Sequence, residues 1–179
     1  MAYVHGTNDI IGFIDLNRCR DRTDFGKGFY LADKIGTAMN WASRRAMISG
    51  GVPTMMQYYI DKGLYQLQGK RFETVPSLEW LEFICFNRRL KLKGAMDTEP
   101  RHDFHWVSGP IADDKIVDVV DEYIEEEITA EEAVRRARVL PQTFQLSIHT
   151  QEAINFINDV GAQYKQFKNG RWTKDWRKP

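Results

Sequence analysis

The sequence predicts a single domain of the α+β class, in which strand-like and helix-like segments follow one another along the whole chain. Its 179 residues suffice for one well-buried core. Residues 144–149 alternate strictly between apolar and polar side chains, which indicates a strand, whereas residues 34–48 show helical periodicity. No repeat, low-complexity segment or linker divides the chain, so residues 1–179 form one domain with a basic, aromatic tail at 164–179.

The first half of the chain predicts two helices, three strands (one of them at 29–31, described below) and a short extended piece within 64–75. Residues 2–5 indicate a strand that ends at the turn-forming residues 6–9, and residues 55–60 indicate another. The glycines and proline at 50–53 end the first helix, and Ser77 is the N-cap of a second helix that runs to about residue 90. Both tryptophans of these helices, Trp41 and Trp80, are expected in the core. One stripe of the first helix is formed by Ala38, Trp41, Ala42 and Arg45, and the buried stripe of the second is expected to be Leu78, Leu81, Ile84 and Cys85.

The second half begins with a polar stretch at 91–101, which we expect to be a mobile loop. A strand is predicted at 105–110 and a helix at 115–126. Thr129 opens a capping box for a further helix that Pro141 ends. Thr150 follows the strand at 144–149 and caps a last helix, in which Ile154 and Ile157 are expected to point inward.

Composition narrows the classes of function. The formal net charge is zero, which argues against a dedicated nucleic-acid coat or a membrane-surface protein. The two cysteines show no metal-ligand spacing with histidine, so no metal site is predicted; free thiols in a reducing compartment are expected, with a disulfide as the alternative. No secretory signal or membrane span is apparent, so the expected location is the cytoplasm.

The tail offers two interpretations. Aromatic residues Phe167, Trp172 and Trp176 alternate with basic residues, a pattern that can bind single-stranded nucleic acid. The alternative, which we favour, is a terminus docked on the domain.

The functional interpretation of the sequence is built around the stretch at 23–32. Two glycines flank Lys27, and Phe29-Tyr30-Leu31 follows at once as a short strand. A glycine-rich turn that leads into a strand with a tyrosine is suited to the rim of a ligand site. The start of the chain, with His5-Gly6-Thr7, strengthens this interpretation.

Together these two motifs and the helix that follows resemble the ADP-ribosyltransferase superfamily, in its poly-ADP-ribose-polymerase-like or diphtheria-toxin-like branch. Residues 80–88, 109–114 and 145–150 further resemble a bacterial family of formerly unknown function that is grouped there. The resemblance extends from about residue 3 to residue 158. It implies a split β-sheet core with flanking helices.

The resemblance implies an NAD site. His5 would hydrogen-bond the adenosine-side ribose, the Gly6 backbone would hold the nicotinamide carboxamide, and Tyr30 would stack on its ring. Thr37 would add a polar contact from the next helix. The matched residues Thr7 and Gly28 belong to the same site, and Lys27 is placed near the diphosphate.

The pattern departs from the superfamily at Gln145, where a glutamate often stabilises the cation that forms as nicotinamide leaves. Glutamine accepts a hydrogen bond but carries no charge and cannot act as a general base. Either the acceptor needs no activation, or Asp113 or Asp114 supplies the carboxylate, or NAD is bound without efficient turnover. Asn87 and Arg88 are additional candidates.

The expected function is mono-ADP-ribosyl transfer from NAD to a macromolecule, with a protein as the favoured acceptor. The resemblance implies a toxin or effector, delivered into a target cell in some cases. The alternatives are NAD hydrolysis, ADP-ribosylation of nucleic acid, or an NAD-binding module that pairs with a small antitoxin-like partner.

Overall fold

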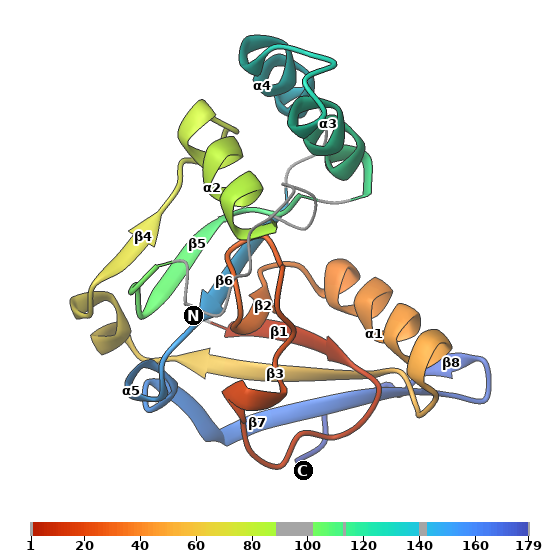
Figure 1. The fold of residues 1–179 in the computed structure, drawn as a ribbon. Coiled ribbons are helices and arrows are strands. Elements are labelled where there is room, and N and C mark those ends of the chain that lie inside the picture. Colours follow the sequence, from red (N-terminus) through yellow and green to blue (C-terminus); the bar gives the residue numbers. More distant parts are fainter. Residues whose placement is uncertain (1, 89–101, 113, 140–142, 179) are drawn as a thin grey trace.

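The computed structural model describes residues 2–88, 102–112, 114–139 and 143–178, with only the backbone described at 114–115 and 158–162. The expected mixed α and β class is confirmed. The described residues form an eight-stranded sheet and five α-helices (Figure 1). The sheet is mixed, because β4 and β5 run parallel while the other neighbours run antiparallel.

The strands lie in the spatial order β4-β5-β6-β2-β1-β3-β7-β8. The N-terminal strand therefore lies at the centre of the sheet, between β2 and β3. The bounds of the strands are β1 Ala2–Thr7, β2 Phe29–Ala32, β3 Thr54–Ile60, β4 Gly69–Arg71, β5 Trp106–Pro110, β6 Phe144–Ile148, β7 Ile157–Lys168 and β8 Arg171–Trp172.

Three of the five helices begin where the sequence places their caps. Side-chain oxygens of Ser77, Thr129 and Thr150 accept backbone N–H bonds at 3.2, 3.3 and 3.2 Å, which satisfies donors in the first turns. The bounds of the helices are α1 Ile35–Ser49, α2 Leu78–Arg88, α3 Asp114–Ile124, α4 Ala130–Arg138 and α5 Gln151–Ile154, with 3-10 turns at Leu16–Arg18 and Lys62–Gln66.

Buried apolar residues form three clusters. The first covers one face of the sheet from Trp106 on β5 to Ile157 on β7, and it includes Phe29 and Leu31 of β2. A second cluster lies beneath α2, α3 and α4, and Tyr30 packs against it. The third joins Val4 and Ala32 to the buried side of α1. In Figure 1, α2–α4 gather at the β4–β5 end of the sheet, apart from α1. Successive side chains of β2 therefore pack into different clusters on the two faces of the sheet.

The two halves of the sheet meet at a weakly paired junction. β1 and β3 are matched at six successive residue pairs, from Ala2 opposite Tyr59 to Thr7 opposite Thr54. β1 and β2 share one pair, Val4 opposite Ala32. The two central strands therefore diverge on leaving this pair.

Several local expectations were wrong. The first strand continues to Thr7, because residues 6 and 7 also pair with β3. The last helix ends at Ile154, and Ile157 instead begins β7 opposite Ile60. Trp41 is 40% exposed and Leu78 is 43% exposed, because each lies on the outer side of its helix; Trp80 is buried as expected.

The predictions for the loop at 91–101 and for Pro141 lie outside the described residues.

The C-terminal tail is docked, as favoured above. β7 and β8 form a hairpin, and the backbones of Tyr164 and Arg177 exchange hydrogen bonds of 2.7 and 2.9 Å. Lys165 Nζ lies 5.1 Å from the ring centre of Trp176, within range of a cation–π contact. Cys19 and Cys85 are free thiols. In the part of the chain that the structure describes, no helix has the length and apolar character needed to cross a bilayer.

Candidate functional site

His5 lies where β1 and β2 diverge. Its Nδ1 is 2.6 Å from the backbone oxygen of Tyr30, and its ring stacks on Phe29 with 4.5 Å between ring centres. A carbonyl only accepts, so Nδ1 carries the proton. Burial lowers the pKa of His5 to about 4, which keeps the ring neutral near pH 7. Nε2 is therefore a hydrogen-bond acceptor.

The hydroxyl of Tyr30 is held by the turn that precedes its own strand. It accepts from Thr23 Oγ1 at 2.8 Å and from the Phe25 N–H at 2.9 Å, and it donates to the Gly26 oxygen at 2.7 Å. Burial raises the pKa of the phenol well above its usual range. The phenol thus organises the glycine-rich turn as a neutral group.

His5 and Tyr30 are in contact through the backbone of β2, but their rings lie on different sides of that strand. The His5 ring stacks on Phe29, which belongs to the cluster on one face of the sheet. Tyr30 packs against the cluster beneath α2–α4 and lies 6.4 Å, between ring centres, from Phe25. The expected enclosure of one nicotinamide between the two rings is therefore not formed by these side chains alone.

Gly6 brings β1 against α1. A Cβ at this position would lie 2.2 Å from the Ala38 oxygen and 2.8 Å from the Ala42 nitrogen, both backbone atoms. Glycine is therefore required by the approach of the helix. Thr7, the last residue of β1, is buried, and Thr37 is half-buried in the first turns of α1.

Gly28 makes room for a second histidine. A Cβ there would lie 2.7 Å from His149 Nδ1, which donates to the Lys27 oxygen at 2.9 Å; the Lys27 side chain is exposed. His149 Nε2 lies 2.8 Å from Ser147 Oγ. Burial and the neighbouring His102 lower the pKa of His149 to about 3. The Lys27–Gly28 turn is thus fixed by a neutral imidazole that faces Tyr30.

Gln145 is joined to the carboxylate of Asp24. Its Nε2 donates to Asp24 Oδ2 at 2.7 Å, and the Ala112 N–H donates to the same oxygen at 2.9 Å. Arg88 Nε donates to Asp24 Oδ1 at 2.9 Å, and a second nitrogen of Arg88 pairs with that oxygen. The structure therefore brings together two predicted residues, Gln145 and Arg88, through a third that the sequence analysis did not single out.

The remaining candidates are placed apart from this network or not described. Asn87 is buried at the end of α2 and donates to the Phe83 oxygen at 2.8 Å. Asp114 begins α3, and its side chain is not described. Asp113 lies outside the described residues. The carboxylate seen beside Gln145 is thus that of Asp24.

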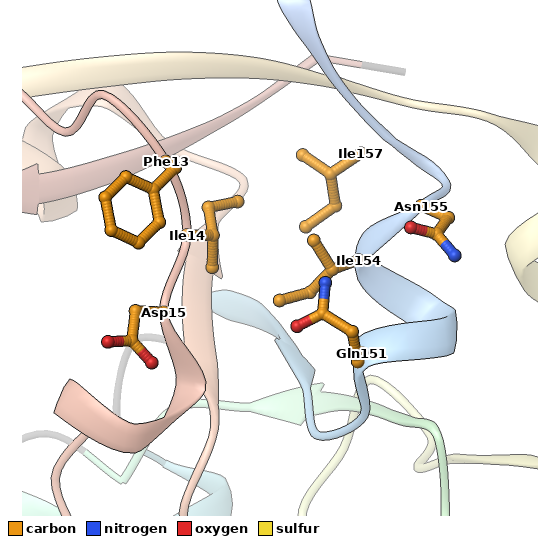
Figure 2. Close-up of a pocket in the computed structure, with 7 residues that line it drawn as sticks. All are labelled: Phe13, Ile14, Asp15, Gln151, Ile154, Asn155 and Ile157. Carbon is orange, nitrogen blue, oxygen red and sulfur yellow. The ribbon is translucent and has the colours of Figure 1, made fainter.

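A separate hollow of about 390 Å³ lies between the loop at 13–15 and α5 (Figure 2). Ile14, Ile154 and Ile157 form its apolar wall, and Asp15, Gln151 and Asn155 add polar groups. Neither His5 nor Tyr30 lines it. Among the described residues, no group of three or more histidine, cysteine, aspartate or glutamate side chains could hold a metal ion.

His149 could have been identified from the sequence, whereas Asp24 could not. His149 and Gln145 are an even number of positions apart in the alternating segment, so their side chains lie on the same face as Tyr30, which pairs with Ser147. Asp24 lies within the 23–32 stretch itself. Its partners, however, are 64, 88 and 121 positions away along the chain, so no local pattern indicates them.

The chain belongs to a family described only as "Protein of unknown function (DUF3990)", whose model matches residues 1–158. This match ends at the start of β7 and leaves out the C-terminal hairpin. Neither a curated protein nor a solved structure matches the chain.

Proposed function

We propose that this protein is a mono-ADP-ribosyltransferase that moves ADP-ribose from NAD to a macromolecular acceptor, with an ADP-ribosyltransferase-like core. The observation that carries the proposal is the contact of His5 with the Tyr30 backbone at the point where β1 and β2 diverge. It brings the two motifs that resemble that superfamily into direct contact. The single pair between the two half-sheets is in keeping with the split sheet that the resemblance implies.

The neutral His5 ring has the chemistry that ribose recognition needs. Its Nδ1–H is taken by the Tyr30 carbonyl, so Nε2 accepts a hydrogen bond from a ribose hydroxyl. Gly6, on the neighbouring position of β1, offers backbone groups for the carboxamide. The Tyr30 ring, on the other face, contributes the apolar surface for nicotinamide.

In the reaction, the bond between nicotinamide and C1 of the ribose breaks, and its electron pair leaves with the nicotinamide nitrogen. The acceptor bonds to C1 and releases its proton to water, because Gln145 cannot take one. Gln145 stabilises the cationic transition state through its amide oxygen. A site of this kind is suited to an acceptor that is nucleophilic without activation.

A binding module is the second candidate. The uncharged Gln145 and the fully bonded hydroxyl of Tyr30 favour it, because neither group can take a proton from an acceptor. In that case NAD would bind without turnover, and the protein would act through a partner such as a small antitoxin-like chain.

Labelled NAD separates these functions. The purified protein is incubated with a cell lysate and NAD labelled in the adenylate, and both protein-bound label and free nicotinamide are measured. Transfer to protein bands that His5→Ala abolishes supports the transferase. Transfer to nucleic acid changes the acceptor class, and free nicotinamide without transfer indicates a hydrolase. No turnover, with NAD still raising the melting temperature, indicates the binding module.

Gln145→Ala tests the role of the glutamine. We expect turnover to fall at least about tenfold, which corresponds to about 1.4 kcal/mol of transition-state stabilisation. A matched control is Gln68→Ala, which removes the same side chain from an exposed position. An unchanged rate for Gln145→Ala would remove Gln145 from the site.

A further inference from the structure

Asp24 connects three parts of the chain that are far apart in sequence. It is buried, with 7% of its surface exposed, and it receives donors from Arg88 at the end of α2, from the backbone of Ala112 after β5, and from Gln145 on β6. All of these partners donate, which matches an ionised carboxylate. Both carboxylate oxygens are engaged.

This contact fixes the orientation of the Gln145 amide. Gln145 is also buried, and Nε2 can donate to Asp24 only when the amide group is turned one way. The two amide heteroatoms branch from one carbon, so Oε1 is directed away from Asp24. The reversed orientation would set Oε1 against the carboxylate, and two acceptors at 2.7 Å repel each other.

We propose that Asp24 is a positioning residue that presents the amide oxygen of Gln145, rather than its NH₂ group, to the NAD site. Arg88 holds the carboxylate in place through its own two contacts. This inference rests on the proposed function for the identity of the ligand. The coupling between Asp24 and Gln145 is independent of it.

The arrangement also accounts for a glutamine at this position. A glutamate at 145 would bring two carboxylates to within hydrogen-bonding distance in a buried setting, where one must take up a proton or move apart. Replacing Asp24 by asparagine as well removes the repulsion between the two carboxylates and lets the asparagine NH₂ donate to the glutamate, while the Ala112 N–H loses its acceptor. The two positions are therefore coupled in a way that a double exchange can reverse in part.

The experiment compares Asp24→Asn, Gln145→Glu and the exchanged double variant with the wild type at pH 7.5. Melting temperature reports the coupling without reference to NAD. We expect each single variant to lower the melting temperature by about 5 °C or more, and the double variant to melt above the worse single variant, because the repulsion between the two carboxylates is removed. Asp175→Asn and Gln68→Glu make the same chemical changes at exposed positions and serve as controls.

The rate of nicotinamide release tests whether Asp24 positions the Gln145 amide. We expect Asp24→Asn to lower kcat for nicotinamide release about tenfold with KM for NAD within about twofold, because the amide is freed to turn while His5, Gly6 and Tyr30 are unchanged. The double variant is expected to regain most of this loss, since the glutamate also offers an acceptor oxygen. A role confined to stability would lower the melting temperature of Asp24→Asn and leave the kcat of the folded protein unchanged.

The outcomes separate the two proposals. If the wild type releases no nicotinamide, the proposed function fails, while recovery of melting temperature in the double variant still supports the coupling. If the double variant melts no higher than the worse single variant, the positioning role is overturned whatever the activity. Recovery of melting temperature without recovery of kcat in an active protein also overturns it.

Discussion

The imidazole of His5 and the backbone carbonyl of Tyr30 are joined by a 2.6 Å hydrogen bond across the two central strands. β1 and β2 share one residue pair, so this side chain takes the place of a backbone donor where the strands separate. The bond also selects the tautomer of His5 and leaves Nε2 as an acceptor. The same residue thus links the halves of the sheet and carries the group assigned to the ribose.

His5→Ala is expected to lower the free energy of unfolding by about 1–3 kcal/mol, because the buried Tyr30 oxygen loses its donor and Phe29 loses its stacked ring. Urea unfolding at pH 7.5 measures this. His5→Asn retains a side-chain donor close to the position of Nδ1 and should lose less. Equal losses in the two variants would show that the hydrogen bond contributes little.

Tyr30→Phe is expected to be destabilising by about 1–3 kcal/mol, because the buried N–H of Phe25 and the Gly26 oxygen lose their shared partner. The matched control is Tyr59→Phe, which removes a hydroxyl from a tyrosine that is 42% exposed on β3. Thermal unfolding of both variants tests the difference. A Tyr30→Phe protein as stable as the control would contradict the role assigned to the phenol in the turn.

Gly6→Ala is expected to displace α1 or prevent folding, since the new methyl group would meet backbone atoms of the helix at 2.2 and 2.8 Å. Gly12→Ala is the matched control, because a Cβ at Gly12 has no atom within 4 Å. Circular dichroism and thermal unfolding distinguish the two. A well-folded Gly6→Ala variant with wild-type stability would show that the helix is not held against β1 as described.

Stability should fall when the pH drops below about 6.5. The folded state lowers the pKa of His5 to about 4 and that of His149 to about 3, from an ordinary value of 6.5. Between these values the unfolded chain binds more protons than the folded chain, so acid favours unfolding. The contribution is fully present above pH 6.5 and is lost progressively as the pH falls through 4 to 3.

Melting temperatures measured from pH 7.5 to pH 4.5 test this pH dependence. His5→Asn removes one of the two groups, so its melting temperature should fall less steeply with acid than that of the wild type. A slope identical to the wild-type slope would show that His5 is not protonated on unfolding.

The sequence was most informative where structure is set locally. The caps at Ser77, Thr129 and Thr150 lie where hydroxyl residues precede helical patterns, because an N-cap requires only neighbouring residues. Ile157 was assigned to the wrong element, since its spacing from Ile154 suits a helix as well as the strand that it joins. Its long-range pairing with Ile60 decided the outcome.

The candidate site was only partly predictable. Its two motifs, around His5 and Tyr30, were identified and are in contact in the structure. The opposite placement of their rings was not foreseen, because it depends on the single pairing of β1 with β2. The carboxylate of Asp24 was missed because it is recognised only by its partners, and the nearest of these along the chain is Arg88.

The pairing of β1 with β2 at one residue pair, Val4 opposite Ala32, has a mechanical consequence for the sheet. Resistance to bending between neighbouring strands comes from their ladder of hydrogen bonds, and this ladder is shortest at the middle of the sheet. The β4-β5-β6-β2 group and the β1-β3-β7-β8 group are therefore held together mainly by side chains, namely the His5 imidazole and the apolar clusters that extend across the junction.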